Sequence, residues 1–449
     1  MLVQSRARWL CFAGLTMGAL ALAPGGRLVA QTQTRQVSVE SFIYDLKSPD
    51  PERRQAAARE LGKVKHLPAT PDLIALAHDP VPAVRREVES ALEHMEDISA
   101  LPGFVAFATD TEVDIRARAV ASLVNIHLPR TKGLGAALTR LGEMVMLTPE
   151  RDLDLVVEPD VPVDPIVITT LTARISDPDK GIRRTAVRGV GILRGKAAVP
   201  ELVRIVREDR DESMRFDGVR SLRKIGDASI GGDLVALLNL NDDTVRNEMM
   251  ATLGSMRYHG AVPELTRIVE SSNKTDVPRV VALAALADIA DPSSAPLFDR
   301  LKADKYEPLR LYANEGIART ASADSKTAIS AARLIEKSAW VRTAQAFALA
   351  RIGELEYLDE LVRALDRPLT RDLAREYLLE TPPANRQALF APREISPSAR
   401  AELAEILGRI GDPEALPRLQ QLSNDTDADV VRAATRATKR ITVVASSSQ

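Results

Sequence analysis

Histidine and cysteine are sparse in this 449-residue sequence, with five and one residues, and they do not fall into catalytic patterns. It has no H-E-x-x-H zinc motif, no G-x-S-x-G nucleophile motif and no two histidines four residues apart; the five histidines are His66, His78, His94, His127 and His259. Gly189 and Gly191 lie in a segment with helical periodicity and no preceding strand, so they do not form a dinucleotide-binding loop. We therefore expect no catalytic, cofactor-binding or metal-binding residues and no cofactor.

An acidic segment, 148–165, is the other place where side chains gather that could bind an ion; it contains Glu150, Asp152, Asp154, Glu158, Asp160 and Asp164. Calcium is a candidate ligand, but the segment lacks the glycine that an EF-hand loop needs for its sharp turn. A docking loop or a plain solvated surface fits it better. Three prolines follow Glu158 and exclude a regular helix, so we expect an irregular insertion that projects from one edge of the fold.

Arginine recurs at intervals of 29 to 33 residues along nearly the whole chain, except for one step of 67 between Arg116 and Arg183. The twelve marker arginines are Arg54, Arg85, Arg116, Arg183, Arg215, Arg246, Arg279, Arg310, Arg342, Arg371, Arg400 and Arg432. Aliphatic residues dominate one position before, seven after and ten after the marker, and small residues dominate three after it. These offsets trace one face of a helix, so each marker belongs to an amphipathic helix.

A second helix follows each marked helix. In the repeat that contains Arg183 it is indicated by Val199, Leu202, Val203 and Val206, which fall at i, i+3, i+4 and i+7. A hairpin of two such helices has an apolar face too large to bury alone, and stacking on its neighbours buries it. The sequence therefore predicts an all-α fold, a single α-solenoid of about twelve helical hairpins over 40–442. A polar lead-in, 31–39, precedes it, and a disordered tail, 443–449, follows it.

The repeated D-x-x-x-x-VR-x-x-A-x-x-x-LG-x-I pattern resembles the HEAT-like repeats first associated with phycobilisome lyases, and the likeness covers roughly 51–441. The resemblance implies an armadillo-like, right-handed superhelix in which the marked helix lines the concave surface. It also implies a possible bilin chromophore lyase or isomerase activity, which we keep as the alternative function.

The marker arginines lie beside the core stripe, at the seam between repeats. Aspartates stand six residues before several of them, near the start of the marked helix, where a carboxylate can accept free backbone N–H groups. We therefore expect these arginines to bridge neighbouring aspartates and backbone carbonyls, and to stabilise the stack rather than bind a ligand.

The face of the marked helices opposite the core stripe is the candidate binding surface. After the insertion it collects a basic cluster beside small and apolar residues, and the candidate partner-binding residues are Arg184, Arg188, Phe216, Arg220, Arg223, Val280 and Leu311. A site of this composition suits an acidic or extended segment of another protein. The alternative is a solvated, partly basic surface without a partner.

The start of the chain resembles a secretory signal: Arg6 and Arg8, an apolar run over 9–23, then a helix-breaking Pro-Gly-Gly. The run is short for a membrane span. We expect residues 1–30 to be the signal peptide and the mature chain to have no stable membrane span, with an uncleaved anchor as the alternative. Cleavage would remove Cys11, the single cysteine, and with it any disulfide or thiolate chemistry.

Lysine and arginine total 60 and aspartate and glutamate 62, a net charge of −2, so the chain has no global attraction for nucleic acid. The favoured interpretation is a non-enzymatic scaffold or adaptor that is exported to the periplasm or cell envelope of a bacterium. It would bind a partner protein along the concave face of the solenoid.

Overall fold

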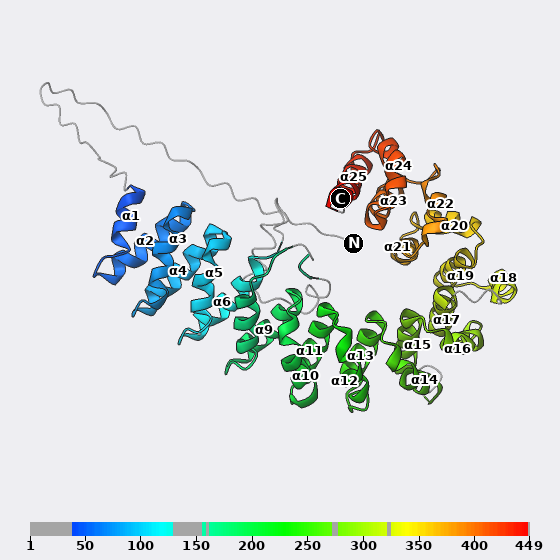
Figure 1. The fold of residues 1–449 in the computed structure, drawn as a ribbon, viewed down its shortest axis with the longest axis horizontal. Helices are drawn as coiled ribbons and strands as arrows, with labels where there is room; N and C mark the ends of the chain where they lie inside the picture. Colours follow the sequence, from blue (N-terminus) through cyan, green and yellow to red (C-terminus); the bar gives the residue numbers. More distant parts are fainter. Residues whose placement is uncertain (1–37, 129–154, 159–160, 272–276, 321–324, 448–449) are drawn as a thin grey trace, which may run out of the picture.

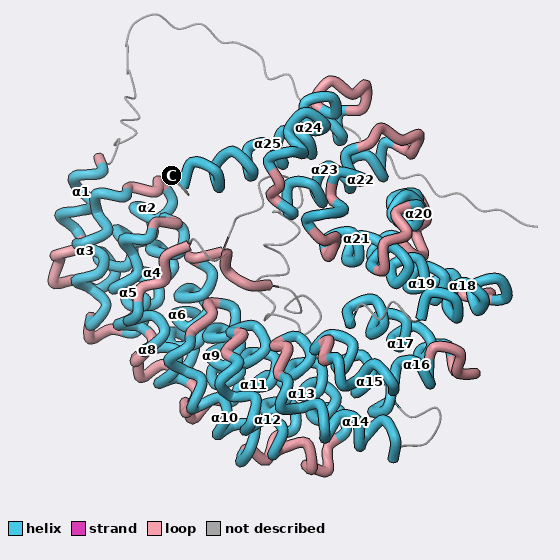
Figure 2. The backbone as a smooth tube through the Cα atoms, turned by 45° about the vertical axis from the view of Figure 1, so that its right-hand side comes forward, coloured by secondary structure: helices cyan, strands magenta, loops and turns pink. Residues whose placement is uncertain are grey.

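The computed structural model describes residues 38–128, 155–158, 161–271, 277–320 and 325–447. These residues form α-helices, short 3-10 turns and loops, and contain no strand (Figure 2). The first half comprises α1 (Val39–Asp45), α2 (Pro51–Lys63), α3 (Thr70–Ile74), α4 (Pro82–Met95), α5 (Leu101–Phe107), α6 (Val113–Asn125), α8 (Pro165–Arg174), α9 (Lys180–Ile192), α10 (Val199–Glu208), α11 (Glu212–Ile225) and α12 (Gly231–Ala236). The second half comprises α13 (Asp243–Ser255), α14 (Val262–Ser271), α15 (Val277–Ile289), α16 (Ala295–Leu301), α17 (Glu307–Thr320), α18 (Lys326–Ile335), α19 (Ala339–Arg351), α20 (Glu356–Ala364), α21 (Arg371–Leu379), α22 (Gln387–Phe390), α23 (Pro397–Ile410), α24 (Leu416–Leu422) and α25 (Ala428–Ser447).

The helices follow one another along an open arc, and consecutive hairpins lie side by side (Figure 1). From α9 onward, the helices that carry the marker arginines line the inside of the arc, and the partner helices such as α10, α14 and α16 form its outer layer. The predicted α-solenoid is confirmed. The resemblance to HEAT-like repeats gave the inner position of the marked helices correctly.

The core runs without interruption between the two layers. The aliphatic residues seven positions after the marker are fully buried, and they include Leu61, Leu92, Leu123, Leu222, Leu253, Leu286, Leu349 and Leu407. At roughly 1.5–3 kcal/mol for each fully buried aliphatic side chain, this row contributes much of the stability of the stack. Because each hairpin shares its core with its neighbours, the repeats stabilise one another.

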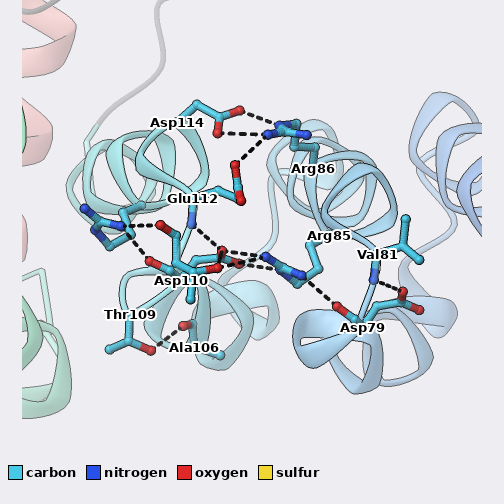
Figure 3. Close-up of polar contacts among 11 residues, drawn as sticks. Asp79, Val81, Arg85, Arg86, Ala106, Thr109, Asp110, Glu112 and Asp114 are labelled. Atoms are coloured by element: carbon cyan, nitrogen blue, oxygen red, sulfur yellow. Dashed lines mark hydrogen bonds and ion pairs between the residues drawn. The ribbon is translucent and has the colours of Figure 1, made fainter.

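The marker arginines join one repeat to the next (Figure 3). Arg85 donates from Nε to Oδ2 of Asp110 in the following repeat at 2.6 Å, and from Nη1 to the carbonyl of Asp79 in its own repeat at 2.8 Å. Asp110 in turn accepts the backbone N–H of Glu112 at 2.9 Å, which orders the turn before α6. Arg54 with Asp79, Arg116 with Asp177 and Arg400 with Asp425 repeat the arrangement. For Arg54, Arg85, Arg116 and Arg400 the expected structural role is confirmed.

The repeat that contains Arg246 lacks the usual aspartate, and a nearby aspartate replaces it. Leu240 occupies the position where aspartate stands in other repeats. Asp242, two residues later, accepts from Nη2 of Arg215 at 2.5 Å and also accepts the backbone N–H of Val245. The bridge between α11 and α13 is therefore preserved by a shifted carboxylate.

A second seam brings the inner helices close together. A Cβ added to Gly254 would lie 2.8 Å from Cα of Ala285 in the next inner helix, and one added to Gly62 would lie 2.7 Å from Cα of Ala91. The glycines stand eight residues after their marker, and the small residue they meet stands six after the next marker. Small residues at both positions therefore let the helix backbones touch, which fixes the angle between successive repeats.

Two predictions, on the C-terminal tail and on the acidic insertion, differ from the structure. Residues 443–447, predicted to belong to a disordered tail, continue helix α25, because the sequence has no glycine or proline there to stop it. The acidic insertion does not simply project from the edge: Val157 is buried, and its N–H donates to the carbonyl of Ile192 at 2.9 Å. The signal peptide, most of the lead-in, 148–154 and 159–160 lie outside the described residues.

Candidate functional site

The predicted basic cluster lies on α9 and α11, but its charges are compensated. Asp217, itself 3% exposed, receives Nε of Arg184 at 2.9 Å and pairs with Nε of Arg188 at 3.1 Å. Arg223 donates to Glu248 at 3.2 Å, and the guanidinium of Arg220 lies 5.7 Å from the ring centre of Phe216.

Arg188 and Arg220 are each only 7% exposed. Carboxylates of the following repeats, including Asp217, therefore neutralise much of the charge of the predicted basic cluster. Val280 and Leu311 lie on α15 and α17, partly buried against the core. Partner binding at these seven residues stays a prediction.

A different group of residues, most of them on inner helices of the second half of the chain, lines a cavity. Its volume is about 410 Å³, and its lining comes from α13, α15, α17, α21 and the residues that follow α13 and α21. The lining residues are Gly254, Ser255, Arg257, Asp288, Glu315, Arg319, Leu373, Glu376, Tyr377 and Glu380. Four carboxyl groups and two guanidinium groups thus face one space.

Arg319 of α17 is the centre of this group. Its Nη2 donates to Glu380 at 2.8 Å, its Nη1 donates to Asp288 at 3.0 Å, and Nη1 also reaches Glu315 at 3.2 Å. Its side chain is 12% exposed. One guanidinium therefore holds carboxylates from three places in the sequence, in the fork geometry that suits arginine.

Tyr377 of α21 completes the group. Its hydroxyl donates to Oε1 of Glu315 at 2.6 Å, and its ring stacks on Phe347 of α19 with centroids 4.3 Å apart. The guanidinium of Arg319 lies 5.9 Å from the same Phe347 ring. We call Glu315, Arg319, Phe347, Tyr377 and Glu380 the bend cluster.

Burial controls the protonation of the acids in this region. Burial raises the pKa of Glu315, and Arg319 and the Tyr377 hydroxyl lower it only in part. Asp288 shows 46% of its side-chain surface, yet the surrounding protein raises its pKa as well, against the lowering effect of Arg319. Burial would lower the pKa of Arg319, but its bond to Glu380 and the nearby carboxylates raise it, so Arg319 stays charged.

The sequence contains signals for the bend cluster that lie outside the apolar stripes of the repeat. Asp288, Arg319 and Glu380 all stand nine residues after their markers, an offset that belongs to none of those stripes. Tyr377 stands six residues after Arg371, where Ala91, Ser221 and Ala285 show the usual small residue. The sequence thus shows charged residues at offset nine and an aromatic residue, Tyr377, where small residues are usual. Whether these side chains come into contact depends on the angle between repeats.

Two further properties concern the described residues. They contain no helix long and apolar enough to cross a membrane. In the same part of the chain, no three His, Cys, Asp or Glu side chains are grouped so as to hold a metal ion. The bend cluster holds opposite charges in fixed positions. Its cavity can therefore contact polar or charged groups of a ligand.

Comparison with known families agrees with this architecture. The family described as HEAT repeats matches residues 39–124, 168–231 and 386–446. These three ranges are HEAT repeats. The finer likeness to the repeats of phycobilisome lyases is not shown by this match.

Among curated proteins, the chain is similar to the deoxyhypusine hydroxylase of Candida albicans, with 27% identity over 202 residues. That alignment covers 43% of this chain and 63% of the relative, so the chain spans less than two thirds of the relative's length. Among solved structures, it is similar to human deoxyhypusine hydroxylase in complex with glycerol, with 19% identity, 55% and 96% of the two chains covered and a TM-score of 0.28. A structure of Kap95p with RanGDP has 16% identity, 90% and 56% coverage and a TM-score of 0.46.

Proposed function

We propose that the protein is a non-enzymatic scaffold that binds another protein along the concave face of its solenoid. The observation that carries this proposal is the contrast between the buried and the exposed side chains of the inner helices. The apolar faces of both helices pack into the shared core, while exposed polar side chains such as Arg223 of α11 and Glu376 of α21 belong to the inner helices of the arc. That surface includes the compensated arginines of α9 and α11 and the cavity beside the bend cluster.

A surface of this kind suits a partner with mixed charge better than a purely acidic one. Arg184, Arg188 and Arg223 are already paired, so an incoming carboxylate has to compete with Asp217 and Glu248. The cavity offers four carboxyl groups against two guanidinium groups. Such compensated surfaces contribute more to selectivity and orientation than to raw affinity.

Site-specific photo-cross-linking in living cells tests this proposal. A cross-linking amino acid replaces Arg223 on α11 or Glu376 on α21, and matched control variants carry it at Arg204 on α10 or Arg267 on α14, in the outer layer. All four side chains are well exposed. We expect one common adduct from the two inner positions and none from the outer ones. Adducts from the outer positions alone would contradict binding along the concave face.

We also propose that the protein acts in the periplasm or cell envelope. The support is the N-terminal sequence, in which Arg6 and Arg8 precede the apolar run 9–23. Fractionation followed by N-terminal sequencing tests this. The expected result is a mature chain in the envelope fraction that begins at Gln31. An intact N-terminus in the cytosol would contradict it.

The curated relative raises one alternative from another class, an enzyme with a HEAT-repeat fold. Deoxyhypusine hydroxylase activity is tested directly by incubating the purified protein with a deoxyhypusine-containing substrate protein, dioxygen and a reductant, and by measuring the addition of one oxygen atom by mass spectrometry. Because the relative from Candida albicans is a hydroxylase, the bilin lyase or isomerase alternative gains no support from it. A scaffold predicts no oxygen addition.

A further inference from the structure

The bend cluster makes a contact that a regular solenoid lacks. In repeat proteins of this kind each repeat touches only its neighbours. Here Glu315 and Arg319 of α17 contact Tyr377 and Glu380 at and after α21, with the whole α19–α20 hairpin between them in the sequence. Phe347 of that intervening hairpin lies between the two partners, stacked on Tyr377. Three consecutive repeats are thereby tied together on the inner side of the arc.

The joint between α19 and α21 also departs from the seam that joins the other inner helices. Where glycine and alanine elsewhere let the backbones touch, this joint places the ring of Tyr377, which is 1% exposed, against Phe347. Backbones in contact cannot slide without a steric clash. At this joint two stacked rings, 4° from parallel, replace that backbone contact with a contact between side chains.

The outer layer is thin at the same place. Helix α22 has only four residues, and its segment contains Pro382, Pro383, Pro392 and Pro397, which prevent a longer helix. Helix α21 itself has nine residues, compared with thirteen in α19. The helices from α21 to α25, which we call the C-terminal arm, therefore begin at a joint where both the inner helix and the outer helix are short.

We propose that the contacts of Glu315 with Tyr377 and of Arg319 with Glu380 form a conformational latch. The latch holds the C-terminal arm in the strongly curved position seen in Figure 1, and the arm swings outward about the α19–α21 joint when the contacts are broken. The latch sets how far apart the two halves of the concave face stand. This consequence for a partner rests on the proposed scaffold function, whereas the latch itself does not.

The stabilising contacts are cooperative, which makes the latch behave as two states. Glu315 is 6% exposed and Tyr377 1%, so removing the Tyr377 hydroxyl leaves Oε1 of Glu315 buried without its partner, while Oε2 keeps its bond from Arg319. When the Glu315–Tyr377 and Arg319–Glu380 contacts are intact, the closed position of the C-terminal arm is favoured. When they are lost, the open position is favoured, because water then reaches the charged groups that have lost their partners.

Distance measurement between the two arms tests the latch without any partner. Spin labels are placed on cysteines introduced at Lys305 and Arg409, both exposed and on opposite sides of the joint, with Cys11→Ser to remove the single native thiol. Double electron–electron resonance then gives the distribution of distances between them. The latch variant is Tyr377→Phe with Glu380→Gln, which keeps the ring stack and the side-chain sizes. The matched control is Tyr306→Phe with Glu376→Gln, which changes the same groups outside the latch contacts.

We expect the latch variant to show a longer mean distance and a broader distribution than the parent, and the control to match the parent. An unchanged distribution in the latch variant, or the same change in the control, overturns the proposal. If the double variant loses its helical circular dichroism, Tyr377→Phe and Glu380→Gln are measured singly. Unchanged distances in both single variants then overturn it.

Discussion

The hydroxyl of Tyr377 donates a hydrogen bond of 2.6 Å to the carboxylate of Glu315, although 62 residues and a complete helical hairpin separate them. The bond exists because Tyr377 takes a position that small residues occupy in other repeats, and its ring fills the space between the inner helices. A single departure from the repeat thus creates both a contact across a repeat and a charged cavity beside it. The regular framework and this departure can be perturbed separately.

The arginine bridges between repeats are expected to carry a large share of the stability. Arg85→Ala leaves Asp110 buried without its partner, and removing one member of a buried pair costs about 3 kcal/mol. The control, Arg59→Ala, removes a solvent-exposed pair with Glu87 and is expected to cost much less stability. Urea unfolding measures both. Equal effects of the two substitutions would show that the marker arginines are not structural.

The close approach of inner helices is expected to be intolerant of a single added methyl group. In Gly254→Ala the new Cβ meets backbone atoms of Ala285 at 2.8 Å, so α13 and α15 must separate, at a cost of about 1–3 kcal/mol. In the control, Gly232→Ala, the new Cβ meets only the Tyr258 hydroxyl, at 3.5 Å. We expect the first substitution to lower the melting temperature and the second to leave it nearly unchanged. A neutral Gly254→Ala would mean that the repeats are not held by backbone contact.

Most of the framework could be read from the sequence because it depends on spacing alone. The register of the markers, the buried leucines and the role of Arg85 and its equivalents follow from helical periodicity and from charge pairs at constant separation. The bend cluster could not be read in this way. It depends on three helices meeting at one point, and small rotations between repeats decide whether they meet.

The predicted binding surface shows the same limit. Arg184 and Arg188 were placed correctly on an inner helix, but their neutralisation by Asp217 of the next repeat depends on how α9 and α11 stack. A list of exposed positions in a helix gives the charges that face outward. It does not give the carboxylates that a neighbouring repeat brings to them.

Glu89 provides a pH-dependent prediction. This glutamate of α4 is 1% exposed, and burial raises its pKa from 4.5 to about 8, with Arg118 3.0 Å away lowering it only in part. The folded state holds the proton between pH 4.5 and 8 and the unfolded state does not, so stability falls as pH rises through this window. Glu89→Gln removes the penalty, and we expect it to stabilise the protein by roughly 2 kcal/mol at about pH 9, with little effect at about pH 4.

The exposed Glu93→Gln variant is the matched control for Glu89, because it changes a glutamate on the same helix at the surface. Urea midpoints measured from about pH 4 to about pH 9 compare the three proteins across the window in which Glu89 titrates. The control is expected to stay close to the wild type, because burial raises the pKa of Glu89 more than the charge of Glu93 does. Parallel pH profiles for the wild type and Glu89→Gln would contradict a buried, protonated Glu89.

The measurement that tests the central claim most directly is hydrogen–deuterium exchange of the protein with and without the partner captured by photo-cross-linking. Binding along the concave face predicts slower exchange in inner helices such as α11, α15 and α21, with exchange in the outer helices α10, α14 and α16 unchanged. Protection confined to the outer helices would contradict the assignment of the concave face as the binding surface.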